Sequence, residues 1–210
     1  VTSAVTITAT EASSGCKKDF PINPPNCSCP NVSPPVSGGN KIICFGDQIP
    51  TLTVTVGTDE TADWYDSPTG GTLLAGNVLS FKPNISAPGV YKFYVEGKST
   101  LFPDCKSNIR TLIEIEIVDN PTGNNASLFK CNEDGNGHAV FNLLDAANQI
   151  NPNPSLSFSF YASLADATAE KNALPVNYTN TGTPTQTLYV IVKNQTGCKK
   201  QVTLTLNIYP

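Results

Sequence analysis

Apolar and polar residues alternate over several short stretches of the chain, and this alternation indicates half-buried β-strands. It is clear in residues 51–56 and 113–117, and again in residues 155–161, 188–193 and 202–208. Turn-forming residues separate these stretches. About seven short strands with a turn every eight to twelve residues predict a β-sandwich.

A hairpin with a Cys-Lys pair at its turn occurs three times. Its cysteines are Cys16, Cys105 and Cys198, which are 89 and 93 residues apart. A unit of about ninety residues is the size of a small domain and too long for a solenoid repeat. The chain is therefore predicted to be a series of β modules cut from a longer array.

The repeat divides the chain into five parts. The first part carries one hairpin only, so we interpret it as the end of an incomplete module. A lone hairpin is marginal in water, and we expect it to pack on its neighbour or to fray. Prolines are dense between positions 21 and 39 and favour a semi-rigid connector. The predicted parts are a C-terminal hairpin (1–25), a Pro-rich linker (26–39), a first module (40–119), a linker (120–126) and a second module (127–210).

Only the second module has segments of helical composition. Residues 143–150 predict a short helix that ends before Pro152. Residues 163–174 predict another, with Ser163 as its N-cap and Pro175 as its stop. The predicted fold class is all-β, with short helices in the second module.

The surface is polar but weakly charged. Charged residues make up 14% of the chain and the net charge is −4, so there is no basic field for nucleic acid or acidic membranes. No apolar run approaches the roughly 20 residues that a membrane-spanning helix needs. The chain has no methionine and no signal-peptide pattern at its start. We interpret it as mature, processed or excerpted, with no nucleic-acid partner and no membrane insertion.

Seven cysteines beside a single histidine indicate disulfides and an oxidising exterior rather than a metal site. Cys44 precedes the first long strand of its module and Cys131 has the corresponding place in the next. The matching separations of 61 and 67 residues predict two clasps within modules, Cys44–Cys105 and Cys131–Cys198. Each would contribute roughly 4 kcal/mol on the chain-entropy model. Cys16 is left to pair with Cys27 or Cys29, unless its partner lies upstream or residues 27 and 29 form a small ring.

No arrangement of residues predicts catalysis. The single histidine, His138, lies in a Gly-rich turn. The carboxylates Glu114 and Glu116 alternate with isoleucines and so mark the solvent-exposed face of a strand. The chain is therefore predicted not to be an enzyme and to need no cofactor. The one candidate metal site is a calcium loop formed by Asn132, Asp134 and Asn136, because hard cations prefer clustered oxygens on Gly-rich turns. Trp64 is expected in the core, whereas Tyr65 is a candidate platform for sugar stacking.

Three motifs resemble a known family. Cys44-Phe-Gly-Asp, Asp63-Trp-Tyr-Asp-Ser-Pro-Thr-Gly-Gly and Ala87-Pro-Gly-Val-Tyr are similar to motifs in the Ig-like repeats of Bacteroidetes surface proteins. The second module, with Phe141-Asn-Leu and Thr196-Gly-Cys, looks like another repeat of those proteins. The resemblance covers nearly the whole chain and implies tandem Ig-like β-sandwiches. Such repeats occur in large adhesins, including gliding-motility adhesins, and many of these leave the cell by the type IX secretion system.

The resulting functional hypothesis is a non-catalytic structural and adhesive segment of a large bacterial cell-surface adhesin. It would form a stalk or filament outside the cell, with neighbouring Ig-like repeats, surface glycans or other surface proteins as partners. The alternative is a carbohydrate-binding or spacer module of a secreted multidomain hydrolase. A glycan array with the native chain and a Tyr65→Ala variant separates the two, since a stalk should bind no specific glycan.

Overall fold

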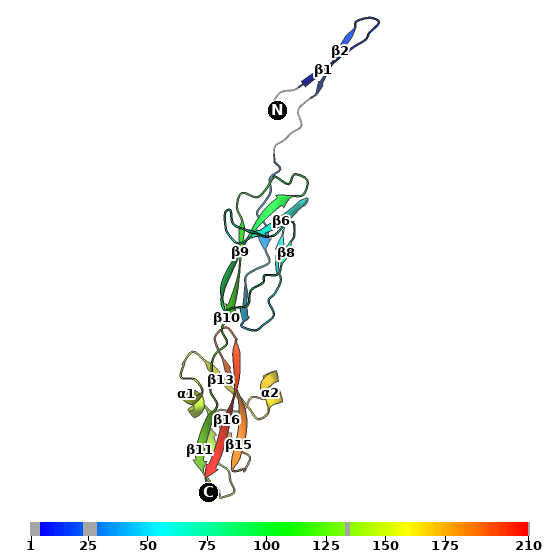
Figure 1. Ribbon diagram of the computed structural model, residues 1–210. Helices are drawn as coiled ribbons and strands as arrows, with labels where there is room; N and C mark the ends of the chain where they lie inside the picture. The colour runs from blue at the N-terminus through cyan, green and yellow to red at the C-terminus, as the bar shows by residue number, and fades with distance from the viewer. Residues whose placement is uncertain (1–4, 23–28, 133–134, 210) are drawn as a thin grey trace.

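The computed structural model describes residues 5–22, 29–132 and 135–209. The architecture is all-β and consists of a hairpin followed by two Ig-like β-sandwich modules (Figure 1). The predicted fold class, with short helices in the second module, is confirmed.

The N-terminal hairpin pairs β1 (Val5–Thr10) with β2 (Lys17–Ile22) in antiparallel register. Ile7 and Phe20 face each other across the pair and remain 54% and 47% exposed. These two side chains thus bury little apolar surface, and a two-stranded hairpin by itself is only marginally stable in water.

The first module packs a five-stranded sheet against a three-stranded sheet. The strand orders are β4-β10-β9-β6-β7 and β3-β5-β8. The first strand of the large sheet, β4, pairs with the last, β10, in parallel, and the other pairs are antiparallel. The strands are β3 (Val36–Ser37), β4 (Lys41–Cys44), β5 (Leu52–Thr55), β6 (Glu60–Tyr65), β7 (Leu73–Ala75), β8 (Ser80–Phe81), β9 (Gly89–Ser99) and β10 (Thr111–Val118).

The core of this module is organised around Trp64, which is fully buried. Its indole N–H donates to the carbonyl of Val78 at 2.9 Å, and its ring lies 5.4 Å from that of Phe81. Ile113 and Ile115 of β10 are also fully buried, as their alternation with glutamates predicted. The expected core role of Trp64 is confirmed.

The first module begins earlier than the sequence suggested. Residues 32–39 were predicted as linker, yet β3 pairs with β5 and Val32 is 6% exposed. The segment also crosses β9 closely, since a Cβ on Gly97 would lie 2.6 Å from the Ser33 carbonyl oxygen. Prolines exclude a central strand but are tolerated on an edge strand such as β3. From here on, the first module means residues 29–119.

The second module repeats this plan with a four-stranded sheet, β11-β16-β15-β13, and a two-stranded one, β12-β14. Again the first strand, β11, pairs with the last, β16, in parallel. Its core includes Phe141, Leu188 and Leu204, all at most 1% exposed. The strands are β11 (Ala126–Cys131), β12 (Val140–Asn142), β13 (Ser157–Tyr161), β14 (Asn177–Thr179), β15 (Thr185–Lys193) and β16 (Lys199–Tyr209).

Both predicted helices of the second module are present. The first is a 3-10 turn, η1 (Leu143–Ala146), that continues into α1 (Ala147–Ile150). The second, α2 (Leu164–Ala169), has Ser163 as N-cap, whose hydroxyl accepts the N–H of Asp166. It stops five residues earlier than predicted, because Glu170 adopts a left-handed conformation at φ 50°. The composition of residues 170–174 was therefore misleading.

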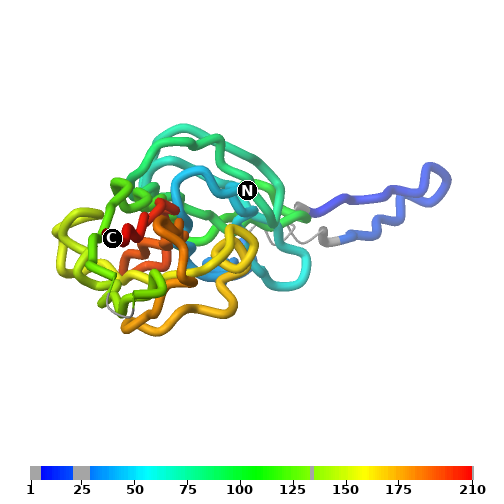
Figure 2. Tube along the Cα trace, turned by 90° about the horizontal axis from the view of Figure 1, so that it is seen from below, coloured from blue at the N-terminus to red at the C-terminus, as the bar shows by residue number. Residues whose placement is uncertain are grey.

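The two modules follow each other along one long axis. Strand β10 runs to the junction, and the C-terminus lies at the opposite end of the second module (Figure 1). Seen from below, the traces of the two modules overlap (Figure 2). No helix among the described residues is long and apolar enough to cross a membrane.

Candidate functional site

A disulfide joins the two modules at their junction. Cys44, the last residue of β4, bonds Cys198, which directly precedes β16. The Cα atoms are 5.4 Å apart, within the usual range for a disulfide. The bond spans 154 residues of sequence, so it closes a covalent loop that contains most of both modules.

The predicted pairs Cys44–Cys105 and Cys131–Cys198 are wrong. Cys44 lies beside Val118 at the end of β10, whereas Cys105 lies in the loop before β10 begins. The eight residues of β10 separate the two places, roughly 26 Å at 3.3 Å per residue. Because β4 is parallel to β10, Cys44 is carried away from Cys105 and towards the second module.

The same geometry separates Cys131 from Cys198. Cys131 pairs in register with Tyr209 at the end of β16, while Cys198 lies just before the start of that eleven-residue strand. A disulfide requires Cα atoms within about 7 Å, and the eleven steps from Cys198 to Tyr209 place the two cysteines about 36 Å apart at about 3.3 Å per residue. Cys131 is exposed and unbonded.

The second disulfide links Cys29 to Cys105, with Cα atoms 5.3 Å apart. It ties the start of the first module to the β9–β10 loop at the end opposite the junction. Cys16 is exposed and unbonded, so the proposed Cys16–Cys29 pair is wrong. Cys27, the other suggested partner, lies outside the described residues.

The turn that follows β4 holds Cys44 in place. Asp47 accepts the N–H of Cys44 at 3.1 Å, and the N–H of Asp47 donates to the Cys44 carbonyl at 3.0 Å. Phe45 donates its N–H to Val118, and the Asn120 amide donates to the Phe45 carbonyl, both at 2.8 Å. The Cys-Phe-Gly-Asp motif thus closes a turn that fixes the sulfur at the edge of the first module.

On the other side, Asn194 organises the loop that carries Cys198. Its side-chain oxygen accepts the N–H groups of Thr196 and Cys198, at 3.2 and 2.9 Å. Its amide nitrogen donates to the carbonyl of Asp119 at 3.3 Å, which is a second contact across the junction. Cys198 itself is 1% exposed. The Thr196-Gly-Cys motif therefore serves the bond between modules.

Glu170 holds the two strands that flank this loop. Its carboxylate pairs with Lys193, the last residue of β15, and with Lys199, the first residue of β16. The hydrogen bond from Lys193, followed in size by the one from Lys199, lowers the pKa of Glu170. The carboxylate therefore remains charged at neutral pH and keeps the base of the Cys198 loop closed.

The linker between the modules is docked on the second module. Asn124 donates its N–H to the Ile150 carbonyl at 3.0 Å, and Asn125 accepts the N–H of Thr203 at 3.0 Å. A Cβ on Gly123 would lie 3.2 Å from Val202, so the backbone packs directly on the core. The junction is thus held by the linker and by the disulfide together.

A separate cluster in the first module explains the Trp-Tyr-Asp-Ser-Pro-Thr-Gly-Gly motif. Arg110 donates to the carbonyls of Ser67 and Gly70, both at 2.7 Å, and its guanidinium lies 3.4 Å from the centre of the Tyr65 ring. Asp66 accepts the N–H of Thr72 at 2.7 Å. This hydrogen bond is the main cause that lowers the pKa of Asp66. One face of Tyr65 is therefore already covered by a cation.

Replacing Gly71 with alanine is expected to destabilise the first module by about 1–3 kcal/mol. Gly71 has φ +74°, and a Cβ there would lie 2.3 Å from the Asp66 carboxylate and 2.6 Å from Ser67 Cβ. Gly70→Ala is the matched control, since Gly70 has a similar φ of +61° but no atom within 4 Å of the added carbon. Urea unfolding of both variants measures the difference, and equal losses would contradict the role of close packing.

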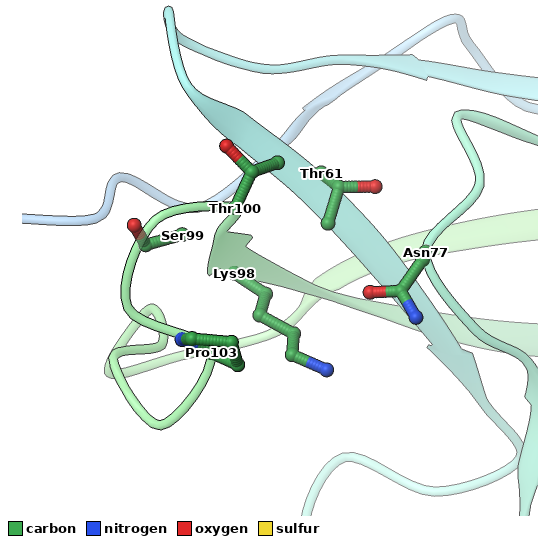
Figure 3. A pocket seen from close by; sticks show the side chains of 6 residues that line it. All are labelled: Thr61, Asn77, Lys98, Ser99, Thr100 and Pro103. Carbon is green, nitrogen blue, oxygen red and sulfur yellow. The ribbon is translucent and has the colours of Figure 1, made fainter.

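A polar pocket of about 440 Å³ lies near the β9–β10 loop. Lys98 from β9 and Asn77 extend into the same space, beside Thr61 of β6 (Figure 3). Lys98 is paired with Asp63 at 3.6 Å, and the Ser99 hydroxyl accepts the N–H groups of Leu101 and Phe102. These polar groups thus have partners that shape the loop.

The predicted calcium loop is only partly described. Asp134 lies outside the described residues. The Asn132 side-chain oxygen accepts the N–H of Gly137 at 2.8 Å and so braces the turn. Within residues 5–22, 29–132 and 135–209, no three His, Cys, Asp or Glu side chains gather as metal ligands. The calcium site stays a prediction.

Two family models match the chain. Residues 31–119 match the CHU_C-associated Ig-like domain, and residues 127–210 match the Flavobacterium inter-domain disulphide bond domain. These matches indicate Ig-like proteins of Bacteroidetes. Cys198 lies within the second match and Cys44 within the first, so the observed bond is of the kind that the second family's name describes. Disulfide-bonded Ig-like modules indicate an extracellular location.

Three of the solved structures similar to the chain are multi-domain fragments. An I-band fragment of titin has 7% identity and a TM-score of 0.41, covering 98% of this chain and 74% of that one. Domains 3–5 of Drosophila OTK have 11% identity and a TM-score of 0.39, with coverages of 92% and 69%. Immunoglobulin domains 1–4 of Sidekick-1 have 13% identity and a TM-score of 0.36, with coverages of 99% and 58%. No curated protein matches the chain.

Proposed function

We propose that the chain is a load-bearing, non-catalytic segment of a large bacterial cell-surface adhesin. The Cys44–Cys198 bond across the junction carries this proposal. A stalk that holds a cell to its surroundings is stretched along its axis, and this bond joins the two modules at their junction. Gliding motility and type IX export are part of the same proposal and rest on the resemblance described above.

The bond defines a short covalent path for tension. Force applied to the two ends passes along β4 to Cys44, through the disulfide to Cys198, and out along β16. The 154-residue separation between the two cysteines is bypassed, so most of the strands of both modules carry no tension. A stalk built in this way keeps its length when it is pulled.

Both strands on the path are well anchored against shear. β4 pairs with β10 over four positions, and β16 pairs with β11 over six and with β15 over nine. Force along these strands must break several inter-strand hydrogen bonds at the same time. The two strands therefore resist being pulled out of their sheets.

Single-molecule stretching of the chain tests the proposal. With both disulfides intact, we expect no lengthening from residues 45–197. Reduction should add about 540 Å of extension, since the 154 bypassed residues contribute about 3.5 Å each when extended.

A variant with Cys44→Ser and Cys198→Ser is the matched control in oxidising buffer. It should lengthen by about half as much as the reduced chain, because Cys29–Cys105 still bypasses 76 residues. Equal extension of the oxidised and reduced native chain would contradict the load-bearing role.

A further inference from the structure

Cys131 has the same place in the second module as Cys44 has in the first. Each is the last residue of its module's first strand and pairs in parallel register with the last strand, Cys44 with Val118 and Cys131 with Tyr209. In both cases the next residue donates its N–H to that partner's carbonyl. Phe45 does so at 2.8 Å and Asn132 at 3.0 Å. The backbone around the two cysteines is therefore equivalent.

The surface beside the two cysteines is also alike. Two residues before each lies an exposed apolar side chain, Ile42 at 60% and Phe129 at 54% exposure. Phe129 stacks on Tyr209, with ring centres 5.6 Å apart, and Tyr209 is 56% exposed. The second module thus presents a thiol next to an exposed aromatic pair at the end away from the first module.

Cys16 has a turn built like that of Cys198. Both lie in the sequence Gly-Cys-Lys-Lys, and the glycines Gly15 and Gly197 have φ of +69° and +92°. The first loop residue closes each turn by donating its N–H to the cysteine carbonyl, from Glu11 at 2.9 Å and from Asn194 at 3.0 Å. Cys16 is exposed and unbonded, whereas Cys198 is buried in its bond to Cys44.

We propose that Cys131 and Cys16 are the two open halves of the inter-module disulfide that Cys44 and Cys198 already form. The partner of Cys131 is the hairpin-loop thiol of a following module built like the Cys16 and Cys198 turns. For the isolated chain, that partner is Cys16 of a second copy, bound head to tail. This inference rests on the proposed stalk function and extends it, since each bond would add one more bypassed loop to the tension path.

The bond forms by thiol–disulfide exchange with a small-molecule disulfide such as oxidised glutathione. The Cys131 thiolate attacks one sulfur of that disulfide, forming a mixed disulfide and releasing one reduced thiol. The Cys16 thiolate of the second copy then displaces the other. The two protein thiols are thus oxidised to one disulfide, and the small-molecule disulfide is reduced to two thiols.

Two full-length variants test the pairing when mixed in a glutathione redox buffer. Cys16→Ser keeps only the Cys131 thiol of this pair, and Cys131→Ser keeps only Cys16. All versions carry Cys27→Ser, so that Cys16 and Cys131 are the only cysteines besides the four in the two disulfides. Random pairing would give twice as many mixed dimers as dimers of either variant with itself. We expect a much larger excess of mixed dimers. The version that keeps both Cys16 and Cys131 should form a ladder of longer oligomers.

Dimers at the random ratio, or no dimers, would overturn the inference. Gel electrophoresis without reductant and mass mapping of the linked peptides give the readout. The stretching experiment on monomers involves neither Cys16 nor Cys131, so it can succeed when this pairing fails, and the two outcomes are distinguishable.

Discussion

Replacing Cys29 and Cys105 together with serine is expected to lower the free energy of unfolding of the first module by about 4 kcal/mol. The bond closes a loop of 76 residues and so restricts the unfolded chain, which is the main source of stabilisation on the chain-entropy model. It also fixes the β9–β10 loop, where Leu101 and Phe102 remain 65% and 52% exposed. For a module of this size, 4 kcal/mol is a large part of a typical stability.

Guanidinium unfolding followed by tryptophan fluorescence measures this loss in the first module alone. Trp64 is the only tryptophan of the chain and lies in that module's core. Cys16→Ser is the control, since it removes an exposed thiol outside both bonds and should change stability by no more than about 0.5 kcal/mol. A double variant as stable as this control would show that the Cys29–Cys105 bond does not stabilise the module.

Trp64→Ala is expected to cost about 3–5 kcal/mol, enough to unfold a large share of the first module. The side chain is fully buried and packs on Phe81, which in turn lies edge-on to Phe93. Its removal leaves a cavity and deprives the Val78 carbonyl of its N–H partner. Backbone amide NMR spectra should lose the signals of the first module while those of the second persist.

Trp64→Phe separates the two contributions. It fills much of the cavity but lacks the indole N–H, so its cost should be about 1–3 kcal/mol for the lost hydrogen bond and the space that remains. If the phenylalanine and alanine variants were equally destabilised, packing against Phe81 would not be the main contribution of Trp64.

The strands that bury one face were predictable from the sequence. Ile113, Ile115 and Ile117 alternate with glutamates and lie on the buried face of β10. The N-cap at Ser163 was predictable for a similar reason, because local hydrogen bonding determines it. These features depend on neighbouring residues, which the sequence displays directly.

The pairing of the cysteines could not be predicted because it depends on the direction of two short strands. β4 (Lys-Ile-Ile-Cys) and β11 (Ala-Ser-Leu-Phe-Lys-Cys) show no clear alternation and were not recognised as strands. Their parallel pairing with β10 and β16 moves Cys44 and Cys131 to the ends of their modules. The similar spacings of 61 and 67 residues reflect a repeated fold and not a repeated bond.

The hairpin cysteines, in contrast, were recognised as a repeated feature. Their positions are equivalent. Cys16 and Cys198 lie in turns of the same kind, and Cys105 lies in the corresponding loop of the first module. The partner of Cys198 lies in the neighbouring module, and that of Cys105 lies in the segment predicted as linker, so a search within residues 40–119 and 127–210 misses both. Repeat proteins place their defining contacts between neighbouring units, and here one such contact is covalent.

Mass mapping of an unreduced tryptic digest tests the connectivity most directly. Trypsin, which does not cut before Pro83, places Cys44 in residues 42–92, Cys105 in 99–106, Cys131 in 131–171 and Cys198 in 194–199. The structure predicts that peptide 194–199 is linked to 42–92, and peptide 99–106 to 19–41 through Cys29. Peptide 194–199 linked to 131–171, together with 99–106 linked to 42–92, would instead mean clasps within modules and would contradict the inter-module bond.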